Sequence, residues 1–312
     1  MIVRTTNHIG QSMLNDVLSQ QTKLYQDYDK ITSNKKFTNI SENPIDASAI
    51  IGINNQLAKI GDYFANISNA NTQLNVQDNA FSTVIDKMNR INELTIQAAN
   101  GASGESGINA VKTEIEELKK NIVALANTKY NDMYIFAGAN ITTPPYAYDE
   151  ATGTISYTGT PSTDPSFERK IEISEGVSVG LNSAGDTVFG VYDAANPDDA
   201  TKSYGLFKTL GDLSKALETN DGEQIREQID KLQASMSNVS EIQSTFSAKV
   251  SKITMTETNL ENTELTLTSQ KQNLEEIDQA TAISEWVKQN YAYQASMQVF
   301  MQMQNNSLLN YM

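Results

Sequence analysis

The sequence contains no cysteine and only one histidine among its 312 residues. Without cysteine there can be no disulfide, no thiol nucleophile and no thiolate-bound metal centre. The single histidine, His8, lies near the N-terminus, where we expect a frayed chain end, so a histidine-based triad or multi-histidine metal site is disfavoured. We therefore expect no catalytic residue, no bound metal and no cofactor, and we interpret the chain as a non-enzyme.

Basic residues and long apolar runs are also scarce. The chain has 23 Lys and Arg against 38 Asp and Glu, a net charge of −15, and no basic stripe that would attract a phosphate backbone. No apolar run reaches the roughly 18 residues of a membrane-spanning helix. Residues 1–8 lack the apolar core of a secretory signal peptide. We expect neither a nucleic acid nor a membrane as a partner.

Glycine and proline are concentrated in the middle of the chain. Between Gly138 and Gly205 lie 8 of the 16 glycines and 5 of the 6 prolines, whereas residues 223–312 contain neither. Both residues break helices and favour turns. The distribution predicts a helical part, a turn-rich insert and a second helical part.

The insert shows the period-two alternation of short β-strands. Strand candidates are residues 154–158, 169–173, 177–179 and 188–191, and residues 149–153 have the composition of a hairpin loop. We expect a small, mostly antiparallel β domain that folds separately from the helices, so that deleting about residues 142–202 would leave the helices folded.

The flanking parts carry apolar residues at seven-residue spacing, which places a narrow apolar seam along a long helix. The first series ends before the insert and the second follows it: Ile53, Ile60, Ile67, Leu74, Phe81 and Met88, then Ile225, Leu232, Val239, Phe246, Ile253, Leu260, Leu267 and Leu274. The predicted fold is mainly α, a long antiparallel helical rod or coiled coil made from both chain halves, with the small β-rich domain inserted in the middle.

Three parts follow from this fold. Residues 1–40 with 277–312 form a terminal coiled-coil domain that becomes ordered on assembly. Residues 41–138 with 206–276 form the helical rod domain, and residues 139–205 form the β-rich outer domain.

The two chain ends carry apolar stripes of their own. Residues 289–312 contain no charged side chain, yet they hold four of the ten methionines. A membrane-surface helix would need a basic face, and a methionine stripe more often belongs to a core than to a cofactor site. We therefore expect helices buried among copies or partners. The expected assembly interface consists of Ile9, Met13, Val17, Leu24, Tyr28, Ile31, Tyr293, Met297, Phe300, Met301, Leu308 and Leu309.

Five segments resemble those of a known family. They are residues 31–37 with 41–48 (Ile-Thr-Ser-Asn-Lys-Lys-Phe and Ser-Glu-Asn-Pro-Ile-Asp-Ala-Ser), 97–101 (Gln-Ala-Ala-Asn-Gly), 134–138 (Tyr-Ile-Phe-Ala-Gly), 293–296 and 307–311. Together they resemble the flagellin superfamily and, within it, the flagellar hook-associated protein 3 family. Asn34 stands where the family usually has glycine.

This resemblance implies a structural protein of the bacterial flagellum, secreted unfolded through the flagellar type III pathway and located outside the cell. It implies self-association in a ring at the hook–filament junction, between the first junction protein and flagellin, where the ring adapts a flexible hook to a rigid filament. It also implies a flagellar export chaperone that binds the C-terminal segment, for which we expect Val287, Tyr291, Met297, Phe300 and Leu308.

Three alternatives remain open at the level of sequence. Flagellin itself shares both terminal segments, although Pro44, residues 134–138 and the Arg4-Thr5-Thr6 start favour the junction protein. A glycoside hydrolase in the insert would use paired carboxylates from Asp149, Glu150, Glu168 and Glu172. A free-standing coiled-coil adhesin is disfavoured because the uncharged C-terminal segment carries no anchor.

Overall fold

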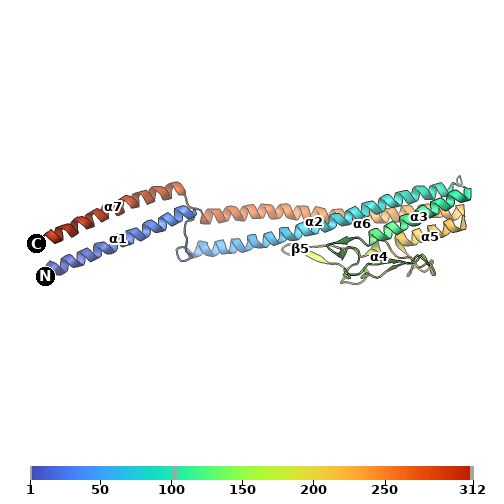
Figure 1. Cartoon of the computed structure of the whole chain (residues 1–312), viewed down its shortest axis with the longest axis horizontal. Coiled ribbons are helices and arrows are strands. Elements are labelled where there is room, and N and C mark those ends of the chain that lie inside the picture. The colour runs from blue at the N-terminus through green and yellow to red at the C-terminus, as the bar shows by residue number, and fades with distance from the viewer. Residues whose placement is uncertain (1, 101–103, 310–312) are drawn as a thin grey trace. The chain divides into compact units, whose positions relative to one another are not determined.

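The computed structural model describes the backbone of residues 2–100 and 104–309 and the side chains of residues 10–100 and 106–303. Its long helices come from both halves of the chain, and its strands are short, so the mainly α fold is confirmed (Figure 1). The helices are α1 (Ile2–Ser33), α2 (Pro44–Ala99), α3 (Gly104–Ala126), α4 (Gly185–Val188), α5 (Gly205–Thr219), α6 (Gly222–Glu275) and α7 (Gln279–Leu309). The strands are β1 (Lys129–Tyr130), β2 (Met133–Tyr134), β3 (Tyr146–Tyr148), β4 (Ile155–Tyr157), β5 (Lys170–Ser174) and β6 (Val177–Gly180).

The chain packs as two compact units. The terminal unit combines residues 1–59 with residues 261–312, and the central unit consists of residues 60–260. Both units therefore contain parts of α2 and α6. The three-part division expected from the sequence stays a prediction.

The predicted heptad positions form the buried apolar stripe of α2 and α6. Every member of both series is buried except Leu274, which is half-buried. In the central unit Arg226, early in α6, donates to the carbonyl of Ala99 at the end of α2 at 3.2 Å. Phe246, later in α6, lies 5.3 Å from Phe81, earlier in α2, between ring centroids. The two helices are therefore antiparallel, and burying one such side chain contributes about 1.5–3 kcal/mol.

The insert consists of two-stranded antiparallel hairpins rather than one sheet. β3 pairs with β4 and β5 pairs with β6, and residues 149–153 form the predicted hairpin loop between β3 and β4. The strand predicted over residues 188–191 is wrong, because α4 ends at Val188 and only Val191 makes an isolated bridge, to Tyr204. A short apolar run cannot distinguish a buried strand from a buried helical turn.

Aromatic side chains join the insert to the helices in one core. The Phe136 ring lies 5.5 Å from Phe81 of α2 and 5.2 Å from Phe189, which follows α4. Phe189 lies in turn 5.8 Å from Phe207 of α5 and from Tyr146 of β3. The insert therefore shares buried aromatic contacts with α5, and the expected effect of deleting residues 142–202 stays a prediction.

Polar side chains of α2 and α6 hold both edges of the β5–β6 hairpin. Asn66 donates to the carbonyl of Glu172 in β5 at 2.8 Å. Lys249 donates to the carbonyl of Gly180 in β6 at 3.1 Å. An open strand edge can pair with another chain. Here a helix side chain bonds a backbone carbonyl of each strand.

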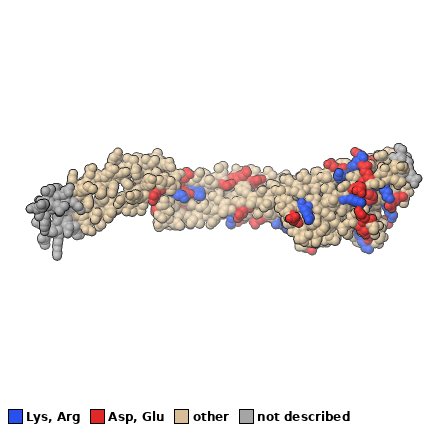
Figure 2. Space-filling model, viewed as in Figure 1, with Lys and Arg blue, Asp and Glu red and all other residues tan. Residues whose placement is uncertain are grey.

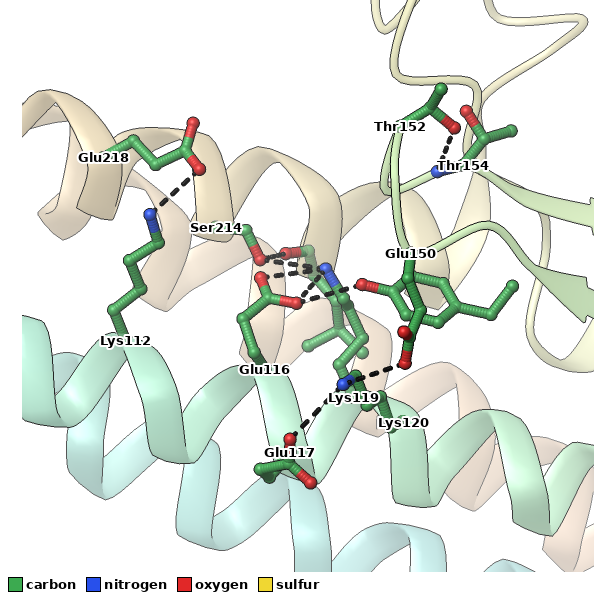
Figure 3. A network of polar contacts seen from close by, with 12 residues as sticks. Lys112, Glu116, Glu117, Lys119, Lys120, Glu150, Thr152, Thr154, Ser214 and Glu218 are labelled. Atoms are coloured by element: carbon green, nitrogen blue, oxygen red, sulfur yellow. Dashed lines mark hydrogen bonds and ion pairs between the residues drawn. The ribbon is translucent and has the colours of Figure 1, made fainter.

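A buried lysine links α3, α5 and the β3–β4 hairpin (Figure 3). Lys119 is 3% exposed and pairs with Glu116 one turn earlier at 2.7 Å. Its ammonium lies 3.3 Å from the Ser214 hydroxyl of α5 and 5.4 Å from the centre of the Tyr148 ring of β3. Tyr148 donates to Glu116 at 3.3 Å. Contacts with α5 and with the β3–β4 hairpin therefore bury a lysine that lies on a helix next to the insert.

This cluster makes stability depend on pH. Burial alone would raise the pKa of Glu116, but hydrogen bonds from Lys119, Ser214 and Tyr148 and the charge of Lys119 outweigh it and lower the pKa below 4.5. The contribution of Glu116 to the free energy of unfolding is therefore fully present above pH 4.5, the pKa of the unfolded chain. It is lost as the pH falls through the lower pKa of the folded state. We expect Glu116→Gln to reduce the drop in thermal midpoint below pH 4.5, measured by circular dichroism. Glu117→Gln, on the exposed side of α3, should leave the drop unchanged; an equal effect of both variants would contradict the assignment.

Candidate assembly interface

The ends of α1 and α7 are defined by local polar contacts. Asp278 precedes α7, and its carboxylate accepts from the backbone N–H of Ala280 at 3.1 Å and of Thr281 at 3.3 Å, as an N-cap does. Asn34 follows α1 with a φ of 57°, the left-handed conformation that terminates helices. The lack of glycine and proline after residue 222 lets α7 continue unbroken.

One face of α1 packs against α7 inside the terminal unit. Trp286 of α7 donates its indole N–H to the carbonyl of Leu24 at 3.3 Å, and its ring lies 6.4 Å from Tyr28. Val17, only 5% exposed, lies nearer the N-terminus and lines one cavity with Ser296, further along α7. The two helices are therefore antiparallel. We call this face the seam.

The seam contains most of the predicted interface residues. Its members on α1 are Met13, Val17, Leu24 and Ile31, and those on α7 are Tyr293, Met297 and Phe300; Val17 is buried and the others are half-buried. The apolar stripes read from the sequence are thus the surfaces by which the two chain ends contact each other. Ile9, Leu308 and Leu309 lie outside the residues whose side chains are described.

The seam is incompletely packed. A cavity of about 280 Å³ opens between the helices, lined by Met13, Asp16, Val17 and Gln20 of α1 and by Ala295, Ser296 and Val299 of α7. The amide oxygen of Gln20 is buried without a hydrogen-bond partner. An unfilled gap forfeits dispersion contacts, and an unpaired buried oxygen costs about 1–3 kcal/mol. The pair of helices is therefore held together weakly by its own contacts.

A second apolar face of the same helices is exposed. We call it the outer face; it comprises Leu14, Leu18, Tyr25 and Tyr28 of α1 and Ile283, Val287, Tyr291 and Met301 of α7. The exposed fraction reaches 69% for Tyr291 and 57% for Met301. Scattered exposed apolar residues are ordinary, but a contiguous set at helical spacing indicates a surface that another chain covers.

Both halves of the outer face lie on one side of the helix pair. At about 100° per residue, the exposed residues of each helix lie about a quarter turn further round than its seam residues. Because the helices are antiparallel, this equal rotation brings the two sets to the same side. Glutamines 21, 294 and 298 lie between them, and Asp29 lies at their edge, in line with Leu18 along α1. Lys23, Lys30 and Glu285 lie on the opposite side, together with the exposed Val299 and Met303. Figure 2 shows mostly uncharged surface over α1 and α7.

The predicted interface is therefore divided by the fold. Tyr28 and Met301, and the expected chaperone contacts Val287 and Tyr291, lie on the outer face, while Met297 and Phe300 lie in the seam and Leu308 is outside the described side chains. Sequence reasoning missed four members of the outer face, which are Leu14, Leu18, Tyr25 and Ile283. A helical wheel with two apolar stripes would have shown them, whereas a search for one stripe does not.

The carboxylates considered for hydrolysis have structural contacts. Asp149 accepts from the Thr152 hydroxyl at 2.7 Å within the hairpin loop, and Glu150 pairs with Lys120 of α3 at 3.1 Å. Glu168 pairs with Lys170 at 3.2 Å. Glu172, through its side chain, accepts from the N–H of Gly176 at 3.2 Å at the β5–β6 turn. These contacts stabilise turns and helix contacts of the insert.

Two further findings concern the described residues. None of the helices within residues 2–100 and 104–309 is both long enough and apolar enough to cross a membrane. The same part of the chain brings together no group of three or more His, Asp or Glu side chains that could hold a metal ion.

Helices from the two chain ends pair with each other, and the chain between them carries a turn-rich insert. This arrangement defines a class of helical proteins in which N- and C-terminal regions form one unit together. The chain belongs to the bacterial flagellin family. Residues 5–141 match the flagellin N-terminal helical region and residues 229–312 the flagellin C-terminal helical region, more than two thirds of the chain.

Two curated relatives match nearly the whole chain. Flagellar hook-associated protein 3 of Escherichia coli (strain K12) and that of Salmonella typhimurium (strain LT2) are each 24% identical, over 97% of this chain and 98% of the relative. Among solved structures, FlgL of Bacillus cereus has a TM-score of 0.57 at 21% identity, covering 71% of this chain and 99% of that chain. The flagellar junction protein FlgL of Legionella pneumophila has a TM-score of 0.58 at 16% identity, covering 73% and 100%. These structures share the fold.

Proposed function

We propose that this chain is a structural, non-catalytic component of the bacterial flagellum that forms a ring at the hook–filament junction. In this role it lies outside the cell, between the first junction protein and flagellin, and adapts a flexible hook to a rigid filament. The observation that carries the proposal is the outer face, a mostly apolar surface on paired terminal helices that a second copy of the chain would cover. Full-length similarity to hook-associated protein 3 supports the junction rather than the filament.

The terminal helices would become ordered on assembly. Most helical stability in proteins comes from packing, and α1 and α7 share a seam with a cavity and an unpaired amide oxygen. Neighbouring copies would bury the outer face and offset the cost of ordering both helices. A unit held weakly in one copy is also compatible with export in an unfolded state through the flagellar type III pathway.

An export chaperone would bind the C-terminal segment before assembly. Val287 and Tyr291 are exposed apolar residues on one face of α7 and are separated by one helical turn, so a chaperone groove could receive them together. The same residues belong to the outer face. Chaperone and neighbouring copy would therefore compete for one surface, which prevents premature assembly.

Deletion of the gene provides the decisive test of this function. We expect cells without the chain to keep hooks and secrete flagellin as unassembled monomers, seen by electron microscopy and by analysis of the culture medium. Gold-labelled antibody to the insert should mark only the base of each filament in the parent strain. If the chain were flagellin, the deletion would remove the filament protein itself and the antibody would label the whole filament.

A further inference from the structure

The two breaks between long helices lie beside each other in the terminal unit. α1 ends at Ser33 and α2 begins at Pro44, while α6 ends at Glu275 and α7 begins at Gln279. Lys35, in the first break, forms an isolated antiparallel bridge with Glu276, in the second. We propose that residues 34–36 and 273–279, which we call the clasp, fix the register of α1 against α7.

Backbone groups make the first set of clasp contacts. The N–H of Lys36 donates to the carbonyl of Glu275 at 2.7 Å, and the N–H of Ile277 donates to the carbonyl of Asn34 at 3.4 Å. The Lys36 ammonium donates to the carbonyl of Asn273. These bonds join residues from opposite ends of the sequence, and each carbonyl fixes one position along the chain. A change of register would break all of them together.

Asn34 contributes through its side chain as well as its backbone. Its φ of 57° is strained for most residues and tolerated by asparagine and glycine. Unlike glycine, asparagine has an amide oxygen, which accepts from the side-chain amide of Gln279 in the first turn of α7 at 3.1 Å. Lys35 adds an ion pair to Glu275 at 2.5 Å. Asn34 is therefore a positioning residue that ends α1 and binds the start of α7.

The seam alone does not specify a unique register. Its apolar positions recur at helical spacing, so sliding one helix by seven residues, about 10.5 Å, would again place apolar side chains opposite each other. The cavity beside Gln20 leaves this part of the seam without close packing, so packing there contributes little to the choice of register. Single polar contacts at defined positions are a known means of specifying register where an apolar seam is permissive.

Register also determines whether the two halves of the outer face coincide. In the observed register Leu24 lies beside Trp286 and Val17 beside Ser296, so Tyr25 of α1 and Val287 of α7 lie at about the same level. A seven-residue slip would displace the α7 half by about 10.5 Å along the α1 half. This consequence rests on the proposed assembly, whereas the role of the clasp within one chain does not.

Cysteine cross-linking tests the register directly, because the natural chain has no cysteine and every disulfide reports an introduced pair. Asp16→Cys with Ser296→Cys reports the observed register, since both residues line the same cavity. Asp16→Cys with Gln289→Cys, or with Met303→Cys, reports a slip of seven residues in either direction. We expect mild oxidation of the dilute full-length chain to cross-link the first pair at least several-fold more than the other two. Oxidation also traps transient pairing, so the helices need not be stable in the monomer.

The clasp variant combines Asn34→Gly, Gln279→Ala, Lys35→Ala and Lys36→Ala. We expect it to raise cross-linking of the slipped pairs several-fold while circular dichroism shows unchanged helix content. The matched control, Lys23→Ala with Lys288→Ala, removes the same number of lysines from α1 and α7, outside the clasp, and should keep the parent pattern. Equal cross-linking of all three pairs in the parent, or a parent pattern in the clasp variant, would overturn the proposal. Sedimentation of the same proteins reports assembly separately, so failure of the clasp is distinguishable from failure of the proposed function.

Discussion

Replacing Phe189 by alanine lowers the free energy of unfolding of the central unit by about 3–5 kcal/mol, the range for truncating a buried phenylalanine. Phe189 is fully buried and lies within 6 Å of the rings of Phe136, Tyr146 and Phe207. Truncation therefore removes contacts to the insert and to α5 at once. We expect urea unfolding, followed by helical circular dichroism, to show the loss although Phe189 itself lies outside the long helices.

The matched control is Met255→Ala, on the exposed side of α6. Met255 is 69% exposed, and we expect its replacement to change stability by less than about 0.5 kcal/mol. Equal urea midpoints of unfolding for Phe189→Ala and Met255→Ala would mean that the insert does not share a core with the helices. In that case deletion of residues 142–202 would again be expected to leave the helices folded, whereas the shared core predicts that this deletion destabilises them.

Introducing aspartate at both Tyr291 and Met301 abolishes assembly while leaving the thermal midpoint of the central unit unchanged. Both side chains lie on the outer face and are exposed in the single chain, so two carboxylates cost little there. In an assembly the same carboxylates would be buried without partners, which costs several kcal/mol per charge. Sedimentation of the purified protein at assembling concentration measures the effect.

Ala292→Asp is the control for this pair. Ala292 is also exposed on α7 but lies on the side away from the outer face, so its replacement should leave assembly intact. Hydrogen exchange on the same samples should show strong amide protection of residues 289–303 only in the assembled protein. Assembly by the double variant, or its loss in Ala292→Asp as well, would contradict the assignment of the outer face.

Much of the helical fold could be predicted because one periodicity governs it. A residue such as Leu74 or Phe246 is buried because every seventh position of a long helix returns to the same face, whichever partner that face meets. The hairpin loop at residues 149–153 was predictable for a similar reason, since turn chemistry is local. The family resemblance was carried by short segments in the correct order, and the comparisons confirm it.

The interface could be predicted only in part. The uncharged C-terminal stretch pointed to a buried role for α7, but the sequence could not tell which of two apolar stripes meets α1 within the chain. Met13, Val17 and Met297 lie in the seam between the two helices, whereas Leu14 and Tyr291 are exposed on the outer face. That choice depends on the register and rotation of two helices more than 240 residues apart in sequence.

The positions of the long helices, the apolar face of α2 and α6 and the hairpin loop were predictable from local sequence, because spacing, turn residues and helix breakers act over a few residues. Three features became visible only in the folded chain: Lys119 is buried, Phe189 packs against the aromatic rings beside α5, and Asn34 binds the start of α7. Each of these three contacts depends on which distant segment of the chain packs beside the residue. Burial and hydrogen bonding belong to pairs of surfaces, and a single stretch of sequence specifies only one surface of each pair.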